Sequence, residues 1–349
     1  MRRLTVQTAP AYECLIGQGL LEKLGAFMRE AGLSGDRVLV VTDSHVAPLY
    51  AARVLESLES AAYASALCTF EAGEARKRLS TIEEIYTALA AHEMGRGDVI
   101  VALGGGVTGD MAGFAAATWM RGIAFVQVPT TLLAQVDSSV GGKTGVDLSC
   151  GKNLVGAFWQ PSLVVADVDT LDTLSADIFA DGMAEIIKHA CIRDAALFSQ
   201  LEAGDWAREA VVAQNIAIKR DIVVADVRER GLRGLLNFGH TAGHALELHS
   251  DYTLSHGRAV AIGMCIMARV GEHLGITASG IVERLERLLQ QYGLPTSLDA
   301  DGEWASLMAA DKKRSGGTLN LVLLREIGDG MLYPMVVTEA IALVQKLCS

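Results

Sequence analysis

The chain lacks the patterns that mark several classes of protein. Its six cysteines are scattered, with no CxxC pair, which excludes a disulfide framework and a thiolate metal site and indicates a cytoplasmic protein with reduced thiols. Aromatic residues make up only 5%, too few for a surface that stacks bases. The longest apolar run, residues 259–268, is far shorter than the ~20 residues of a membrane-spanning helix. The basic start, MRRLTVQTAP, lacks the apolar stretch of a signal peptide.

Positive charge is also scarce. Thirty Lys and Arg against 41 Asp and Glu give a net charge of −11, which disfavours nucleic acid and anionic membranes as partners. An anionic small molecule remains a possible substrate, because a local cluster of basic side chains can invert the field around it. Half of the 349 residues are apolar, so the chain can bury a large core and is long enough for about two domains.

The apolar patterning changes along the chain. Short apolar runs alternate with helical patterns up to residue 174, which is typical of a parallel sheet covered by helices. Helical patterns dominate from residue 175 onward. We therefore predict an α/β, Rossmann-like domain over residues 1–174 and a mostly α-helical domain over residues 175–349. Strands are expected at 4–16 (a hairpin), 37–43, 64–70, around 98–106, 123–129 and 162–170, and at 318–324 and 331–333; helices are expected at 80–94, 176–191, 207–226, 235–249, 257–274 and 281–292.

A glycine run, GGGVTGD at residues 104–110, follows an apolar strand and opens a helix. Bare glycines let backbone N–H groups approach a pyrophosphate at the positive end of the helix. The match to GxGxxG is weak by itself, and a tight strand-to-helix turn gives the same pattern. Acidic candidates for a ribose lie upstream, at Asp43 and Glu74.

A second glycine-rich segment, DSSVGGKTGVDLSCGK at residues 137–152, carries Lys143 and Lys152. We expect a loop here that becomes ordered by contact with a ligand or domain. Its lysines suit phosphate or carboxylate, although two solvated lysines would look the same.

Four of the eight histidines fall within residues 240–256, and three of them, His240, His244 and His256, have a spacing that suits a metal site. His240 and His244 are four residues apart on one helix face, and His256 opens the next helix. Together they predict a Zn²⁺-type site with nitrogen and carboxylate ligands, since a peptidase would need Glu where Thr241 stands. Glu185 and Lys188 share a helix face three residues apart, which alone indicates only a salt bridge.

These features combine a phosphate-binding loop, a metal site without thiolates and several cations. A nicotinamide cofactor with a Lewis-acid metal would suit oxidation of an alcohol. The cations favour a substrate that carries phosphate and carboxylate.

Six motifs, in order, resemble 3-dehydroquinate synthases over nearly the whole chain. They are GGGVTGDMAGFAA, VPTTLLAQVDSSVGGKTGVD, GKNLVGAFWQP, GMAEIIKH, GLRGLLNFGHTAGHALE and the late DKK. The resemblance implies the synthase fold and conversion of 3-deoxy-D-arabino-heptulosonate 7-phosphate to 3-dehydroquinate and phosphate. It implies oxidation by NAD⁺, phosphate elimination, reduction and aldol closure, with Zn²⁺ or Co²⁺ bound, in a homodimer.

The resemblance also implies site residues. The metal ligands are Glu185, His240 and His256, which makes His244 a substrate contact. NAD⁺ is expected at Asp43, Ala72, Gly73, Glu74, Ala75, Arg76, Lys77, Gly106, Val107, Thr108, Gly109, Asp110, Thr130, Thr131, Asp137, Lys143, Lys152, Thr170, Leu171, Asp172 and Thr173. The substrate is expected at Lys143, Asn153, Lys188, Lys219, Arg233, Asn237 and His244, and at one or both of Lys312 and Lys313. Arg121 is implied to reach the partner subunit's site.

The chain departs from the family pattern at four positions. Arg258 stands where Glu is usual, and we expect it to point away from the metal. Ala72, Val227 and Asp147 replace a usual Asp, acid and Asn. The alternatives are a sister cyclase that makes inosose or valiolone rings, a metal-dependent polyol dehydrogenase, and a non-catalytic NAD-binding protein. Arg233 and Asn237 match the dehydroquinate pattern, whereas dehydrogenases lack the LNFGHT and GKN motifs.

Overall fold

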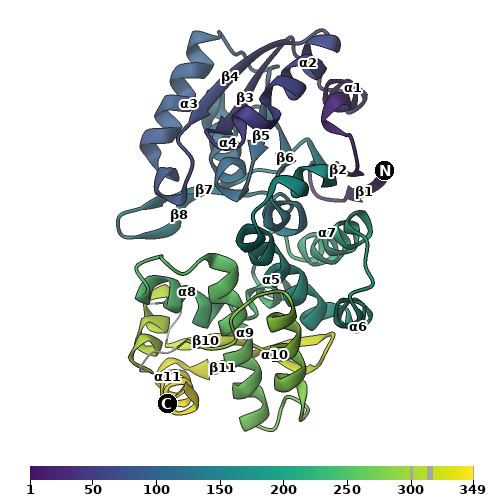
Figure 1. Ribbon diagram of the computed structural model, residues 1–349. Coiled ribbons are helices and arrows are strands. Elements are labelled where there is room, and N and C mark those ends of the chain that lie inside the picture. The colour runs from purple at the N-terminus through teal and green to yellow at the C-terminus, as the bar shows by residue number, and fades with distance from the viewer. Residues whose placement is uncertain (299–301, 313–316, 349) are drawn as a thin grey trace. The chain divides into compact units, whose positions relative to one another are not determined.

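The computed structural model describes residues 1–298, 302–312 and 317–348. The chain divides into two compact units, and Figure 1 labels their elements. Unit 1 comprises Met1–Leu174 and Arg208–Val227, and unit 2 comprises Ser175–Ala207 and the chain from Arg228 onward. The sequence-based boundary at residue 174 therefore differs at one element. Helix α7 (Arg208–Ala225) belongs to unit 1 because it packs on β1, β2 and η5.

Unit 1 is built on a seven-stranded sheet with the order β1-β2-β9-β6-β5-β3-β4. All neighbours pair in parallel except β1 and β2. The strands are β1 (Arg2–Val6), β2 (Tyr12–Gly17), β3 (Arg37–Asp43), β4 (Ala64–Phe70), β5 (Val99–Gly104), β6 (Ala124–Pro129) and β9 (Leu163–Asp167). The sheet confirms the predicted α/β class. Its helical elements are η1 (Leu21–Lys23), α1 (Leu24–Glu30), η2 (Ala47–Ala51), α2 (Ala52–Ser60), η3 (Glu74–Arg76), α3 (Leu79–Ala91), α4 (Gly106–Thr118), η4 (Trp119–Arg121), η5 (Ala134–Ser138), η6 (Val168–Thr173) and α7.

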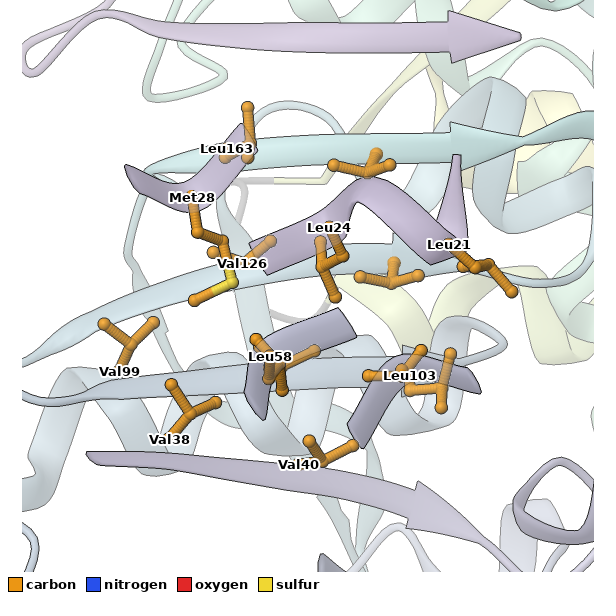
Figure 2. Close-up of a cluster of buried hydrophobic side chains, with 14 of the residues drawn as sticks. Leu21, Leu24, Met28, Val38, Val40, Leu58, Val99, Leu103, Val126 and Leu163 are labelled. Atoms are coloured by element: carbon orange, nitrogen blue, oxygen red, sulfur yellow. The ribbon is translucent and has the colours of Figure 1, made fainter. Parts of the chain in front are cut away.

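The central strands read as continuous apolar runs because helices cover both faces of the sheet. Every residue of β5 is buried. On one face, Leu24, Met28 and Leu58 pack with Val38 and Val126, as Figure 2 shows. Side chains of α3 and α4 form a second cluster on residues such as Leu39 and Ile100.

The order of the strands reverses between β3 and β5. The chain passes from β3 to β4 on one side and then returns to place β5 on the other side of β3. The loops after β3 and β5 therefore leave in opposite directions, and open α/β sheets bind ligands at this edge. Asp43 ends β3 and Gly104 ends β5.

The glycine-rich segment expected as a loop is largely a hairpin. β7 (Lys143–Leu148) pairs antiparallel with β8 (Gly151–Phe158). Two glycines allow the two strands to approach closely, since a Cβ on Gly156 would lie 2.1 Å from the Thr144 carbonyl oxygen. Two of the glycines that argued for a loop, Gly145 and Gly151, are thus part of a two-stranded ribbon.

Unit 2 is mostly helical, as predicted. Its elements are α5 (Ala176–Arg193), α6 (Ala195–Ala203), η7 (Leu232–Asn237), α8 (His240–His249), α9 (His256–His273), α10 (Ile281–Gln291), η8 (Gly302–Lys312), the hairpin strands β10 (Thr318–Glu326) and β11 (Asp329–Val336), and α11 (Val337–Cys348). The single helix expected over residues 235–249 is wrong. Gly239 has a φ of 79°, which breaks the helical path and lets α8 start at His240. Within the described residues, no helix is long and apolar enough to cross a membrane.

Candidate active site

The first candidate site lies where the strand order of unit 1 reverses. Gly105 precedes α4, and no side chain caps the first turn of that helix. Thr108 Oγ1 donates to Asp43 Oδ2 at 3.3 Å, and Thr130 N donates to the Gly104 carbonyl at 2.9 Å. The ends of β3, β5 and β6 are therefore tied together beside the N-terminus of α4. Amides at such a position suit a phosphate, and Asp43 suits a ribose hydroxyl.

Two glycines of the run are in close contact with other side chains. A Cβ on Gly104 would lie 2.5 Å from Thr108 Oγ1 and 2.7 Å from Thr108 Cβ, shorter than real Cβ contacts, so the turn favours glycine there. A Cβ on Gly109 would lie 2.7 Å from Gln127 Oε1, at the end of a side chain of β6, which would have to shift. Gly106 and Val107 open α4, and Asp110 lies in its second turn.

The ammonium group of Lys77 is bound by side chains of unit 1. Its side chain is buried, with Nζ 2.7 Å from Asp110 Oδ2 and 2.7 Å from Asn153 Oδ1. Burial alone would lower the pKa of this ammonium, but the charges of Asp110 and Glu74 outweigh it and raise the pKa. Lys77 is therefore a charged link between α4 and the β7–β8 hairpin. Asp147 supports the same link, because its Oδ1 accepts the Asn153 N–H at 2.7 Å.

The other basic residues predicted in unit 1 have different surroundings. Lys219 of α7 forms an ion pair with Asp137 and also donates to the Asp137 carbonyl at 2.7 Å. Lys152 Nζ lies 3.6 Å from Glu74 Oε1. Lys143 is exposed at the start of β7. The structure thus brings Lys219 and Asp137 together, although the sequence assigned one to substrate and the other to NAD⁺.

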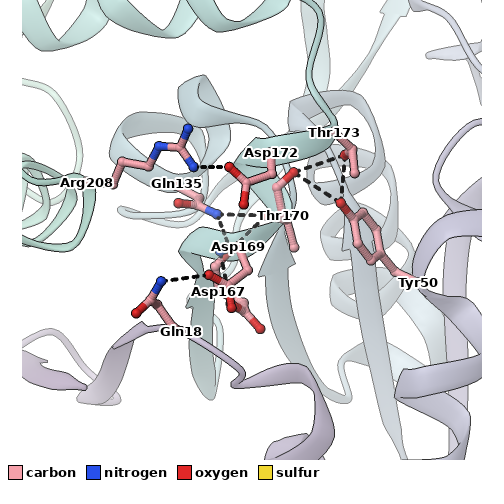
Figure 3. A network of polar contacts seen from close by, with 9 residues as sticks. All are labelled: Gln18, Tyr50, Gln135, Asp167, Asp169, Thr170, Asp172, Thr173 and Arg208. Atoms are coloured by element: carbon pink, nitrogen blue, oxygen red, sulfur yellow. Dashed lines mark hydrogen bonds and ion pairs between the residues drawn. The ribbon is translucent and has the colours of Figure 1, made fainter.

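Residues 170–173 form a polar network, shown in Figure 3. Tyr50 Oη donates to the Thr170 carbonyl at 3.1 Å and lies 2.7 Å from Thr173 Oγ1. Gln135 Nε2 donates to Thr170 Oγ1 at 3.1 Å, and Asp172 pairs with Arg208. Thr170 and Leu171 are 1% and 2% exposed. In this structure they therefore offer a ligand almost no side-chain surface.

The segment after β4 is mostly exposed, and its backbone is tied to the end of β3. Ala72 N donates to Ser44 Oγ at 3.0 Å. Arg76 pairs with Glu84 at 2.6 Å. Gly73 and Ala75 are exposed beside them.

Two further predicted residues complete unit 1. Thr131 Oγ1 accepts the Ala134 N–H at 3.2 Å, so its hydroxyl serves the start of the helical turn after β6. Arg121 is exposed in a turn where both it and Met120 have positive φ, 71° and 49°. Backbone of this kind is uncommon for residues other than glycine.

The second candidate site is a cluster of donors in unit 2. Glu185 lies in the middle of α5, and His240 and His256 are the first residues of α8 and α9. Glu185 Oε1 is 3.6 Å from His240 Nε2 and 3.4 Å from His256 Nε2. All three donor atoms lie within 4.8 Å of one another. A tetrahedral Zn²⁺ with bonds of about 2.05 Å would separate its ligands by about 3.4 Å. The donor set therefore fits a divalent ion.

The remaining nitrogen of each ring also has a partner. His240 Nδ1 lies 3.2 Å from the Phe238 carbonyl, and His256 Nδ1 lies 3.4 Å from Glu247 Oε2. Donation from Nδ1 leaves the Nε2 lone pair for a metal. Burial, together with the charge of Lys188, lowers the pKa of His240 to about 3. Burial would also lower the pKa of His256, but hydrogen bonds with Glu185 and Glu247 raise it to about 10.

Close helix packing brings the donors together. A Cβ on Gly257, next to His256, would lie 2.3 Å from the Cα of Asp181 on α5, and one on Gly263 would lie 2.0 Å from the Gly239 carbonyl oxygen. Ser255 Oγ donates to Asp181 Oδ1 at 2.6 Å. The start of α9 is thereby held against α5, and α8 against α9.

The cations near this cluster differ in exposure. Lys188 is 1% exposed, with Nζ 2.5 Å from Glu185 Oε2, and Arg233 of η7 is also 1% exposed. Asn237 Nδ2 donates to Glu229 Oε1 at 3.2 Å. Arg258 pairs with Asp177 at 2.7 Å. Because Asp177 is largely exposed, Arg258 points toward solvent, as expected.

His244 lies beside the three donors, and its ring is exposed. Its centroid is 5.4 Å from that of His240 and 6.1 Å from that of His256. It groups with Glu247 and His256, not with Glu185. Lys312 is the last residue of η8, and Lys313 lies outside the described residues.

Sequence reasoning missed Glu247, Asp181 and the Phe238 carbonyl. Only Glu247 carried a signal, since it lies seven residues after His240 and therefore on the same face of α8. The contact of Asp181 with Ser255 depends on the packing of two helices distant in sequence.

Comparison with known proteins identifies the family. The model for the N-terminal part of 3-dehydroquinate synthase matches residues 67–181, and that for its C-terminal part matches residues 182–314. A 3-dehydroquinate synthase from Symbiobacterium thermophilum is 48% identical over 95% of this chain and 96% of its own.

Two solved structures share the fold. A 2-deoxy-scyllo-inosose synthase complexed with carbaglucose-6-phosphate, NAD⁺ and Co²⁺ is 26% identical, with a TM-score of 0.88 over 99% of this chain and 100% of that one. A 2-epi-5-epi-valiolone synthase from Streptomyces hygroscopicus with NAD⁺ and Zn²⁺ is 28% identical, with a TM-score of 0.87 over 97% and 96%. The family models and the identity over nearly full length lead to one conclusion: the chain belongs to the 3-dehydroquinate synthase family.

Proposed function

We propose that the protein converts 3-deoxy-D-arabino-heptulosonate 7-phosphate to 3-dehydroquinate and phosphate, with NAD⁺ and a divalent metal as cofactors. The observation that carries this proposal is a difference in identity. The chain is 48% identical to a 3-dehydroquinate synthase over 95% of its length, but 26% and 28% identical to the inosose and valiolone synthases. The sister-cyclase alternative is therefore less well supported.

The residues of unit 1 would bind the dinucleotide. The amides of the first turn of α4 suit its pyrophosphate, and Asp43 suits its ribose. Lys77 keeps α4 in place through Asp110 and holds the β7–β8 hairpin through Asn153.

The residues of unit 2 would bind the metal and the anionic groups of the substrate. Glu185, His240 and His256 would hold the ion. When bound, the two cofactors supply Lewis-acid polarisation of a hydroxyl oxygen and reversible hydride transfer. Lys188 and Arg233 are buried cations suited to carboxylate or phosphate. His244 presents an exposed imidazole beside the rings of His240 and His256.

The test is to measure both products from the heptulosonate phosphate, with added NAD⁺ and Zn²⁺ and a chelated control. The reaction returns its hydride, so equal amounts of phosphate and dehydroquinate should form without accumulation of NADH. Folded, metal-loaded protein that makes neither product would contradict the proposal. Turnover of sedoheptulose 7-phosphate or glucose 6-phosphate instead would favour a sister cyclase.

Metal binding should release a proton. In the metal-free protein the pKa of His256 is about 10, whereas that of His240 is about 3. At pH 8 His256 is protonated and must lose its proton to bind a metal, while His240 is already neutral. Affinity should rise about tenfold per pH unit from pH 7 to 9. Calorimetric titration with Zn²⁺ in buffers of different ionisation enthalpy measures the release, and the absence of any proton release at pH 8 would contradict the prediction.

We also propose a cytoplasmic homodimer in which Arg121 contributes to the partner's site. Its support is the exposed arginine in a turn with two consecutive positive φ values before Gly122. Sedimentation should give twice the 37.0 kDa mass of the chain. A single-chain mass at working concentration would contradict it.

A further inference from the structure

The His256 ring lies between two carboxylates. Its Nε2 faces Glu185 Oε1 at 3.4 Å, and its Nδ1 faces Glu247 Oε2 at 3.4 Å. Glu247 is only 3% exposed and belongs to α8, the helix that begins with His240. Helix α8 therefore supplies the candidate ligand His240 at its start. Two turns later it supplies a buried acid, Glu247, that contacts the other candidate ligand, His256.

The two histidines differ in what holds them. The partner of His240 Nδ1 is a neutral backbone carbonyl, that of Phe238. The partner of His256 Nδ1 is a side chain that can carry a full negative charge. A buried carboxylate is costly unless it is paired or hydrogen-bonded, so its place behind a ligand ring calls for a role.

We propose that Glu247 is a positioning residue of the metal centre, which accepts the Nδ1–H of His256 and thereby directs the Nε2 lone pair at the ion. This inference rests on the proposed metal role of His256. The carboxylate sets the ring orientation and the tautomer, and its charge makes the imidazole a stronger donor. It also adds a negative charge close to the ion without occupying a coordination position.

Direct ligation by Glu247 is the competing arrangement. His244, Glu247 and His256 also offer donor atoms within 4.8 Å of one another. The geometry favours the outer role, because Glu247 meets Nδ1 whereas Glu185 and the Nε2 atoms of both ligand histidines form the other group. A single ion cannot be bound by both nitrogens of one ring.

The experiment is a Co²⁺ titration of the metal-free full chain, followed by its visible absorption spectrum. Glu247→Gln keeps the size and an acceptor oxygen but removes the charge. We expect the Co²⁺ affinity of Glu247→Gln to fall about 10–100-fold. At saturation its absorption bands should keep the wild-type intensity, because the coordination number does not change.

The matched control is Glu272→Gln on α9. Glu272 lies 16 residues after His256, about 24 Å along the helix, and its carboxylate accepts a backbone N–H, that of Val282 at 3.2 Å, in place of a histidine N–H. The Co²⁺ affinity of Glu272→Gln should match that of the wild type.

Wild-type affinity in Glu247→Gln would overturn the inference. Loss of all binding in Glu247→Gln, with binding retained in Glu185→Gln, would overturn it in favour of direct ligation. If the wild type itself bound no Co²⁺, the proposed metal role would fail instead. Should Glu247→Gln not fold, Glu247→Asp keeps the charge but withdraws it by one methylene. A loss of Co²⁺ affinity in Glu247→Asp, smaller than the roughly 10–100-fold expected on removal of the charge, would support the inference. Wild-type affinity in Glu247→Asp would contradict it.

Discussion

Glu185→Gln should lose both metal binding and a large part of the protein's stability. Glu185 is fully buried and supplies the one carboxylate of the proposed ligand set. Its removal should cost more than the about 10–100-fold in metal affinity expected for an outer partner, and turnover should fall to background. The substitution also takes away the carboxylate 2.5 Å from the buried Lys188 ammonium. Breaking a buried pair in this way costs about 3–5 kcal/mol. Metal titration and chemical unfolding in chelator measure the two effects separately.

A double variant separates the two roles of Glu185. Glu185→Gln with Lys188→Met removes both charges, so stability should recover relative to the single variant while metal affinity stays lost. Glu283→Gln changes an exposed acid of α10 and should behave as wild type. Metal binding by Glu185→Gln at wild-type affinity would show that the ligand set is wrong.

Gly263→Ala should disrupt the metal site without changing any ligand. The new Cβ would lie 2.0 Å from the Gly239 carbonyl oxygen and 2.9 Å from Gly243 N. Both atoms are backbone, so α8 and α9 must move apart, at a cost of about 1–3 kcal/mol or more. His240 directly follows Gly239, and His256 lies two turns before Gly263. A displacement of about 1 Å between groups that act together can cost about 100-fold, so metal affinity should fall by about that factor.

The control for this prediction is Gly97→Ala. Nothing lies within 4 Å of a Cβ at Gly97, and its φ is not positive. This variant should retain wild-type thermal unfolding and metal affinity. If Gly263→Ala binds metal as tightly as the wild type, the close contact between the two helices is not what sets the donor geometry.

Local signals in the sequence predicted most of the fold. The apolar runs of β3, β5 and β6 are long and uninterrupted because helices bury both faces of the sheet, so periodicity sufficed. The missed features depend on contacts that periodicity does not report. Gly239 divides an otherwise continuous helical pattern. The glycines of β7 and β8 indicate a loop when only the sequence is considered. Their role, which is to let the two paired strands approach closely, depends on contacts between the strands.

The proposed metal donors were predictable in part. The spacing of three histidines indicated a site, but choosing Glu185, His240 and His256 over His244 needed the family resemblance. In the structure His240 and His256 have equivalent positions. Each begins a helix, and the Nε2 of each faces the Glu185 carboxylate. Glu247 shares a helix face with His240, but the sequence does not show that its partner is His256 on another helix.

The assignment of α7 to unit 1 has a consequence for how the chain is made. Synthesis runs from the N-terminus, so all the strands of the seven-stranded sheet leave the ribosome before residues 208–227 exist. Until then β1 and β2 lack the helix that packs on them, and Asp137 lacks Lys219. Unit 1 cannot finish folding as an independent N-terminal domain of 174 residues. Its completion must wait until the chain has passed through α5 and α6, so part of unit 2 is made before unit 1 is complete.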